Sequence, residues 1–119
     1  MKISVSQVDV LSRDWDRRLG ERIALFLQSQ FEDAFSEPEA EVSAVVCELI
    51  PKARGYGFST EREIAVYMTT AWVLGKEFDC SFPKARNILT AQQLSSEQKS
   101  EALIDLTEHL LAEFEGDQR

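Results

Sequence analysis

The clearest structural signal in this sequence is the stretch Phe58-Ser59-Thr60-Glu61-Arg62-Glu63-Ile64, residues 58–64. A threonine followed three residues later by a glutamate is the pattern of a capping box, in which each side chain binds a backbone N–H at a helix start. Apolar residues then recur at helical spacing before Gly75, a residue suited to a helix end: Ile64, Tyr67, Met68, Ala71, Trp72 and Leu74. We therefore expect a helix after Thr60 that places most of these side chains in the core.

Upstream of this stretch, the same spacing predicts a long helix that starts at Trp15. Its apolar face is formed by Trp15, Leu19, Ile23, Phe26, Leu27 and Phe31. Arginines and acids interleave on the other positions, which is typical of a solvated outer side. Ahead of this helix, Val5, Val8 and Leu11 fit either one short helical turn or an extended lead-in.

A second long helix is expected from about Pro38, because Ser36 can cap a helix and proline is tolerated in a first turn. Its apolar stripe consists of Val42, Val45, Val46, Leu49, Ile50 and Ala53. Pro51 lacks a backbone donor and should kink this helix or end it early. The glycines of Gly55-Tyr56-Gly57 favour a turn that closes the segment.

Two further helices are expected toward the C-terminus. Pro83 suits the first turn of a short helix that buries Ile88 and Leu89. Ser95 and Gln98 repeat the capping spacing at the start of the last helix. That helix carries one apolar face and ends near Gly116, leaving a polar tail; the face consists of Leu103, Leu106, Leu110 and Phe114.

These elements add up to an all-α protein. The sequence has no internal repeat and no alternating run long enough to require a sheet. A chain of 119 residues with 44% hydrophobic content is long enough for one core. We therefore predict a single helical domain over residues 1–119, built as a compact irregular bundle of four main helices plus one or two short ones, with a polar tail from about residue 116.

The net charge and the composition argue against two classes of partner, nucleic acids and membranes. A formal net charge of -8 opposes binding to a phosphate backbone, so no nucleic-acid partner is expected. No stretch approaches the roughly 18 apolar residues of a membrane span, so we expect no membrane association. The first residues also lack the apolar run of a secretory signal, which predicts a cytoplasmic protein whose two cysteines, Cys47 and Cys80, stay reduced.

No catalytic, metal-binding or cofactor-binding residues emerge from the sequence. The single histidine, His109, lies among acids in the last helix, which predicts an exposed or partly packed side chain and offers no partner for nucleophilic catalysis. Cys47 and Cys80 stand alone and cannot supply the clustered ligands of a zinc site. We therefore expect that this chain is not an enzyme and needs no cofactor.

The acidic residues are candidates for a partner-binding surface. Residues 32–41 contain five acids and no basic residue, and the candidates within them are Glu37, Glu39 and Glu41. The last helix adds seven acids against Lys99 alone. A negative face of this kind steers a basic partner toward the protein, and the alternative role for the same residues is ordinary solubility.

Aromatic residues near predicted helix ends are a second set of candidates: Tyr56, Phe58, Phe78 and Phe82. Aromatic side chains anchor many protein interfaces. The alternative is that these four residues pack in the core or in loops.

The central part of the chain resembles small helical accessory proteins that bacteria encode beside type VI secretion effectors and their spike proteins. The resemblance rests on residues 53–58, on residues 59–64, on residues 74–79 and on Phe82-Pro83 with Ile88-Leu89, and it covers about residues 53–90. It implies a stoichiometric binder without catalytic residues, either an immunity protein or an effector chaperone or adaptor.

We accordingly predict a non-catalytic protein-binding accessory whose partner is a secreted bacterial toxin or a type VI spike component. An immunity protein covers or distorts a toxin site, whereas a chaperone covers apolar surface on a chain that awaits export. The alternative is a self-associating structural protein, in which an apolar helix face forms a symmetric homodimer.

Overall fold

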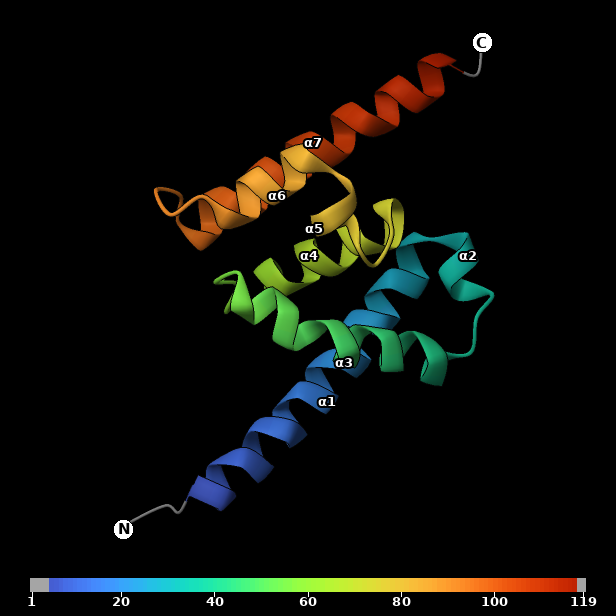
Figure 1. Cartoon of the computed structure of the whole chain (residues 1–119). Coiled ribbons are helices and arrows are strands. Elements are labelled where there is room, and N and C mark those ends of the chain that lie inside the picture. The colour runs from blue at the N-terminus through green and yellow to red at the C-terminus, as the bar shows by residue number, and fades with distance from the viewer. Residues whose placement is uncertain (1–4, 118–119) are drawn as a thin grey trace. The chain divides into compact units, whose positions relative to one another are not determined.

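The computed structural model describes the backbone of residues 5–117 and the side chains of residues 15–113 except Asp33 and Phe35. All regular elements in this part of the chain are helices (Figure 1): α1 (Val5–Gln30), α2 (Glu32–Phe35), α3 (Glu39–Gly55), α4 (Glu61–Leu74), α5 (Phe78–Ser81), α6 (Pro83–Thr90) and α7 (Ser96–Asp117). The all-α class is therefore confirmed. The chain divides into two compact units, of which the first ends at Pro51 and the second begins at Lys52. The single domain over residues 1–119 stays a prediction.

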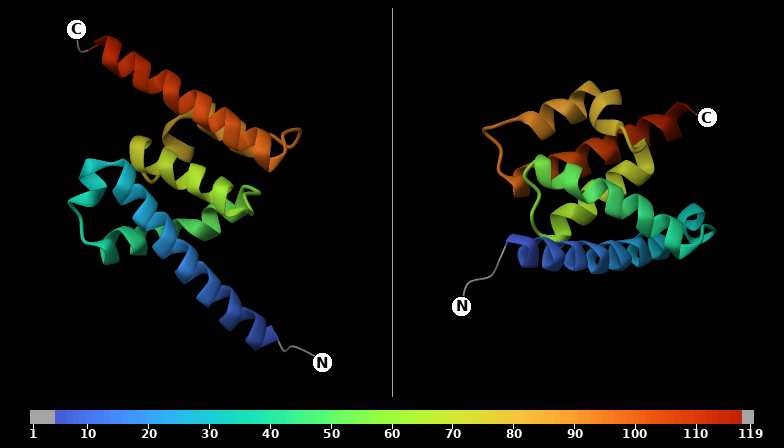
Figure 2. Two further views of the ribbon diagram at one scale, coloured as in Figure 1. Left: turned by 180° about the vertical axis from the view of Figure 1, so that it is seen from behind. Right: turned by 60° about the horizontal axis from the view of Figure 1, so that its bottom comes forward.

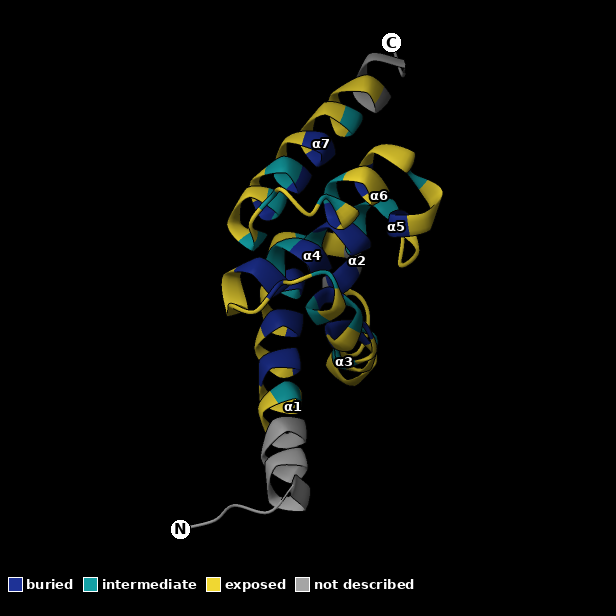
Figure 3. Cartoon of the chain, turned by 60° about the vertical axis from the view of Figure 1, so that its left-hand side comes forward, coloured by how far each residue is buried: buried dark blue, intermediate teal, exposed yellow. Residues whose placement is uncertain are grey.

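In the first unit, α1 begins at Val5, so the lead-in before Trp15 belongs to the same helix. The side chains of Val5, Val8 and Leu11 lie outside the described residues. Figure 3 shows that buried and exposed positions alternate along α1, and the predicted apolar face is only partly buried. Trp15 is 58% exposed and Phe26 is 45% exposed, so these two members of the predicted apolar face lie outside the core. The buried positions are Leu19, Ile23, Ala24 and Leu27.

The connection after α1 contains the four-residue helix α2, which the sequence did not predict and which packs against α1 (Figure 2). The Ser36 hydroxyl donates to the Glu32 carbonyl at 3.0 Å. Ser36 therefore ends α2 and does not cap α3, contrary to the prediction. The amide of Gln28 on α1 donates to the Glu37 carbonyl at 3.0 Å, which holds the loop beside α1.

Helix α3 begins at Glu39 and has the predicted apolar stripe, since five of its six residues are buried: Val42, Val46, Leu49, Ile50 and Ala53. Pro51 does not end this helix, because α3 continues through it to Gly55. The Tyr56 N–H donates to the Lys52 and Ala53 carbonyls at 3.3 and 3.1 Å, so the last turn is hydrogen-bonded beyond the proline. Of the two outcomes predicted for Pro51, the early end was therefore wrong, and the kink stays a prediction.

Helices α1 and α3 lie close together where Gly20 faces Cys47. A Cβ atom added at Gly20 would overlap the Sγ atom of Cys47. The thiol of Cys47 also donates to the Asp16 carbonyl at 3.9 Å. A glycine at position 20 therefore permits this crossing.

In the second unit, α4 starts with the predicted capping box. The Glu63 N–H donates to Thr60 Oγ1 at 3.1 Å, and the Thr60 N–H donates to Glu63 Oε1 at 3.2 Å. Glu63 accepts a further bond from the Ser96 hydroxyl at 2.7 Å, so the start of α4 is tied to the start of α7. The helix ends at Leu74, and the next residue, Gly75, has a φ of 110°, which favours glycine.

The last two helices of the second unit, α6 and α7, begin where the sequence predicts. Pro83 occupies the first turn of α6, which buries Leu89. The Ser95 N–H donates to Gln98 Oε1 at 2.9 Å at the start of α7. Helix α7 packs against α4 and α6, and α5 packs against α6 (Figure 2). Helix α7 runs past Gly116 to Asp117, and the end of the predicted polar tail lies outside the described residues.

Candidate functional site

Three of the four predicted aromatic candidates lie together around Tyr67 in the second unit. The Tyr67 ring centroid is 4.9 Å from that of Phe78, 5.9 Å from that of Phe58 and 6.1 Å from that of Tyr56. Phe58 is 1% exposed and Phe78 is fully buried, so these two side chains pack in the core and do not form an exposed anchor. Tyr56 is half-buried, as is Phe82 between α5 and α6.

A buried carboxylate lies beside this aromatic cluster. Asp79 on α5 is 2% exposed. Its Oδ1 accepts a bond from Lys52 Nζ at 2.9 Å, and its Oδ2 accepts one from the Tyr56 hydroxyl at 2.6 Å. Burial by itself disfavours the charged form, but the bonds from Tyr56 and Lys52 and the lysine charge outweigh it and lower the pKa of Asp79. Asp79 therefore remains ionised and joins the end of α3 to α5.

The two tyrosines near Asp79 remain protonated. Burial, together with the hydrogen bond and the negative charge of Asp79, raises the pKa of Tyr56 to about 12. Burial and the same carboxylate also raise the pKa of Tyr67, whose hydroxyl has no hydrogen-bond partner among the described residues. Two hydrogen bonds to Asp79 therefore join the end of α3 to α5 beside the aromatic cluster.

Glu63 is the second buried carboxylate of this unit. Burial raises its pKa, but bonds from the Ser59 N–H, the Ser96 hydroxyl and the Thr60 N–H outweigh that effect and lower it. All of these donors belong to the starts of α4 and α7. The Glu63 carboxylate therefore holds the start of α4 against the start of α7.

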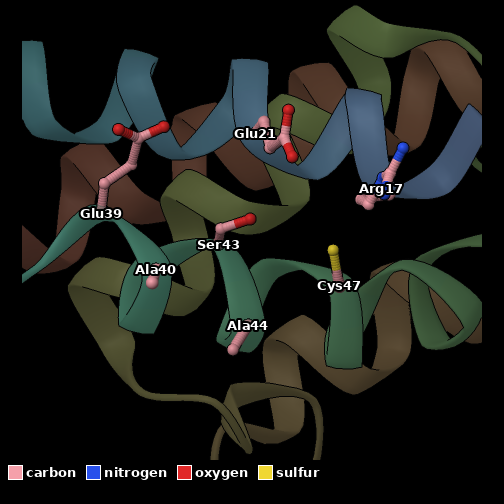
Figure 4. A pocket seen from close by; sticks show the side chains of 7 residues that line it. All are labelled: Arg17, Glu21, Glu39, Ala40, Ser43, Ala44 and Cys47. Carbon is pink, nitrogen blue, oxygen red and sulfur yellow. The ribbon is translucent and has the colours of Figure 1, made fainter.

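The acidic candidates Glu37, Glu39 and Glu41 are all exposed in the first unit. Glu39 borders a hollow of about 450 Å³ between α1 and α3 (Figure 4), lined by Arg17, Glu21, Glu39, Ala40, Ser43, Ala44 and Cys47. Figure 4 shows Glu39 and Arg17 toward opposite ends of the hollow, with Glu21 and Ser43 between them. The hollow combines one guanidinium, two carboxylates and a thiol, and its lining has no histidine or lysine that could activate that thiol.

The remaining groups with catalytic potential are dispersed. His109 is exposed, and its Nε2 atom lies 3.1 Å from Oε1 of Glu113, one turn along α7. Cys47 and Cys80 are free thiols. Among the described residues, no three histidine, cysteine or carboxylate side chains gather as a metal site would require. None of the helices in that same part of the chain is long and apolar enough to cross a membrane.

A surface that sequence reasoning missed lies on α1. Three of the large hydrophobic side chains exposed in the described chain belong to this helix: Trp15, Leu25 at 53% exposure, and Phe26. At roughly 100° per residue, they share one side of the helix with Arg18 and Arg22. The guanidinium carbon of Arg22 lies 6.0 Å from the centroid of the Trp15 ring, in cation–π geometry. We call these five residues, Trp15, Arg18, Arg22, Leu25 and Phe26, the α1 face.

No protein-family model, curated protein or solved structure matches this chain.

Proposed function

We propose that this chain is a non-catalytic accessory protein that binds another protein, and that the α1 face is its contact surface. The observation that carries the proposal is the exposure of Trp15, Leu25 and Phe26 on one side of one helix. Apolar side chains exposed singly need no explanation, but a group rimmed by polar residues is typical of an interaction site. Tryptophan and arginine, both present here, dominate the binding energy of many interfaces.

The hydrogen bonds of the two buried carboxylates support the same proposal. The two buried carboxylates with lowered pKa, Asp79 and Glu63, are both occupied by donors from neighbouring helix ends. Perturbed carboxylates at an active site instead face a cleft that a substrate can enter. Binding of a macromolecule requires no such cleft. It requires an exposed surface with apolar side chains, and the α1 face has one.

The resemblance over residues 53–90 suggests a class of partner, namely a secreted bacterial toxin or a type VI spike component. An immunity protein and a chaperone or adaptor would both use an exposed apolar face. They differ in outcome, because the first neutralises the toxin and the second prepares a chain for export.

Coexpression with the products of the neighbouring genes tests the proposal. We expect one of them to copurify with this chain at a fixed stoichiometry. Survival of cells that express the toxin would then identify immunity, whereas toxicity together with improved solubility of the effector would identify a chaperone or adaptor. If no neighbouring product forms a complex, the proposed function is wrong.

Self-association is the second candidate function, because the exposed Leu111 on α7 lies among the acids of that helix and could contact the α1 face of another copy. Such a contact joins two different surfaces and would form rings or open chains. The mass in solution tests it: a mass that rises with concentration favours self-association, and a constant monomer mass excludes it.

A further inference from the structure

We infer that α3 works as a hinge, and that this helix bends at Pro51 so that the two units of the chain can reorient without either unit unfolding. This inference goes beyond the proposed function and does not depend on it. Three observations carry it, namely where the boundary between the units falls, how each half of α3 is held, and what a proline does to the helix at that point.

The boundary between the two compact units falls inside a helix. The first unit ends at Pro51 and the second begins at Lys52, whereas α3 runs without interruption from Glu39 to Gly55. Compact units of one chain are ordinarily joined by exposed linkers that few contacts cross. Here the backbone of one helix makes the connection, so the helical hydrogen bonds around Pro51 must take up any reorientation of the units.

Each half of α3 is held by its own unit. In the half before the proline, Cys47 packs against Gly20 of α1. In the half after it, Lys52 Nζ and the Tyr56 hydroxyl next to the helix end donate to the Asp79 carboxylate of α5, at 2.9 and 2.6 Å. The two halves are therefore anchored to different helices, and the turn between the anchors is the place where α3 can bend.

Pro51 weakens the helix at that turn. A proline has no N–H, so the bond to the carbonyl of Cys47, four residues earlier, cannot form. Only the bonds from residues 52–54 to the carbonyls of residues 48–50 then connect the two halves. The Pro51 side chain is exposed, so core packing does not account for a residue that disfavours helix interiors. Sharp kinks in helices occur mostly at prolines, which makes this position suited to a hinge.

Hydrogen exchange of the full chain locates the hinge. In Pro51→Ala, the new N–H can bond to the Cys47 carbonyl and strengthen the connection. We expect amide exchange at residues 52–54 to slow by about tenfold relative to the buried positions of α4. The ratio is the readout because alanine also stabilises the whole chain. Glu41→Ala is the matched control: Glu41 is exposed on the same helix, and its substitution adds no bond across the boundary, so the ratio should stay unchanged.

Residual dipolar couplings of the backbone N–H groups test the movement itself. In the unaltered chain, the couplings of α1 and the couplings of α4 with α7 should give alignment tensors of different magnitude, because units that reorient about a hinge average their couplings to different degrees. In Pro51→Ala the two magnitudes should converge. Circular dichroism checks that the variant keeps its helix content.

Two results would overturn the inference. One is a single alignment tensor that fits both units of the unaltered chain, since the units would then move as one body. The other is a folded Pro51→Ala variant in which either the exchange ratio or the difference between the tensors is unchanged, since the movement would then not depend on the proline. Neither measurement involves a binding partner, so failure of the hinge leaves the proposed function intact.

Discussion

Replacing Asp79 with alanine should destabilise the folded chain by about 2–3 kcal/mol. The substitution removes two charge-assisted hydrogen bonds, from Lys52 at 2.9 Å and from Tyr56 at 2.6 Å, each worth about 1.5–3 kcal/mol. Two effects reduce the sum. The Lys52 side chain is 35% exposed and Tyr56 is half-buried, so both donors can bind water in the variant, and alanine also avoids the cost of burying a charge.

Urea denaturation followed by circular dichroism measures this loss, since the signal of an all-helical chain reports its unfolding directly. The melting temperature should fall by roughly 10 °C. Asp105→Ala, which removes an exposed acid from α7, is the control and should change stability by no more than about 0.5 kcal/mol. The double variant Asp79→Ala/Lys52→Met should lose less stability than the sum of the two single losses, because both substitutions break the same bond between Lys52 and Asp79.

Equal small effects of Asp79→Ala and Asp105→Ala would contradict a stabilising role for the buried carboxylate. Simple addition of the losses in the double variant would contradict it as well, because Asp79 and Lys52 would then act independently. Either result would leave the buried position of Asp79 without an energetic explanation.

Three further perturbations test the packing. Gly20→Ala should cost about 1–3 kcal/mol through overlap with the Cys47 thiol, and Cys47→Ala in the same chain should recover most of that loss in urea denaturation; no recovery would contradict the close crossing. Thr60→Ala should cost about 1 kcal/mol, measured in the same way, and an unchanged midpoint would mean that the capping box contributes nothing. The pKa values of Asp79 and Glu63 lie below their ordinary values of 3.8 and 4.5. The unfolded chain therefore binds more protons in acid, and stability should fall as the pH drops through this range toward the lower folded-state pKa values; Asp79→Asn should flatten the curve, and an unaltered curve would argue against the assigned shift.

The helix starts at Thr60 and Ser95 could be predicted because a capping box is local. Both partners lie within four residues, and their side-chain chemistry is visible in the sequence. The short helices α2 and α5 could not be predicted in this way, because four residues are too few to repeat an apolar spacing. The early end that was one predicted outcome at Pro51 did not occur, because the loss of one donor is tolerated when the following turn is well bonded.

The exposure of the α1 face could not be predicted from periodicity. The spacing of Trp15 and Phe26 fits the apolar stripe, but spacing does not fix how wide a stripe the neighbouring elements cover. Both residues lie at the edge of that stripe, beside Leu19, and remain exposed. Spacing also did not reveal that Phe58 and Phe78 are buried beside the Tyr67 ring.

The buried ion pair of Asp79 could not be predicted from the residues near it in the sequence. Its partners Lys52 and Tyr56 precede it by 27 and 23 positions, and nothing near Asp79 in the sequence marks it as buried. Polar residues that bridge distant elements become visible only when the helices are packed together.

The most direct test of the proposed binding role is the affinity of the coexpressed natural partner for three forms of this chain, measured by titration calorimetry. We expect Trp15→Ala to weaken the complex at least tenfold, while Leu111→Ala and the unaltered chain bind equally well. Circular dichroism should show that all three forms remain helical to the same extent. If Trp15→Ala binds the partner as tightly as the unaltered chain, contact through the α1 face is contradicted.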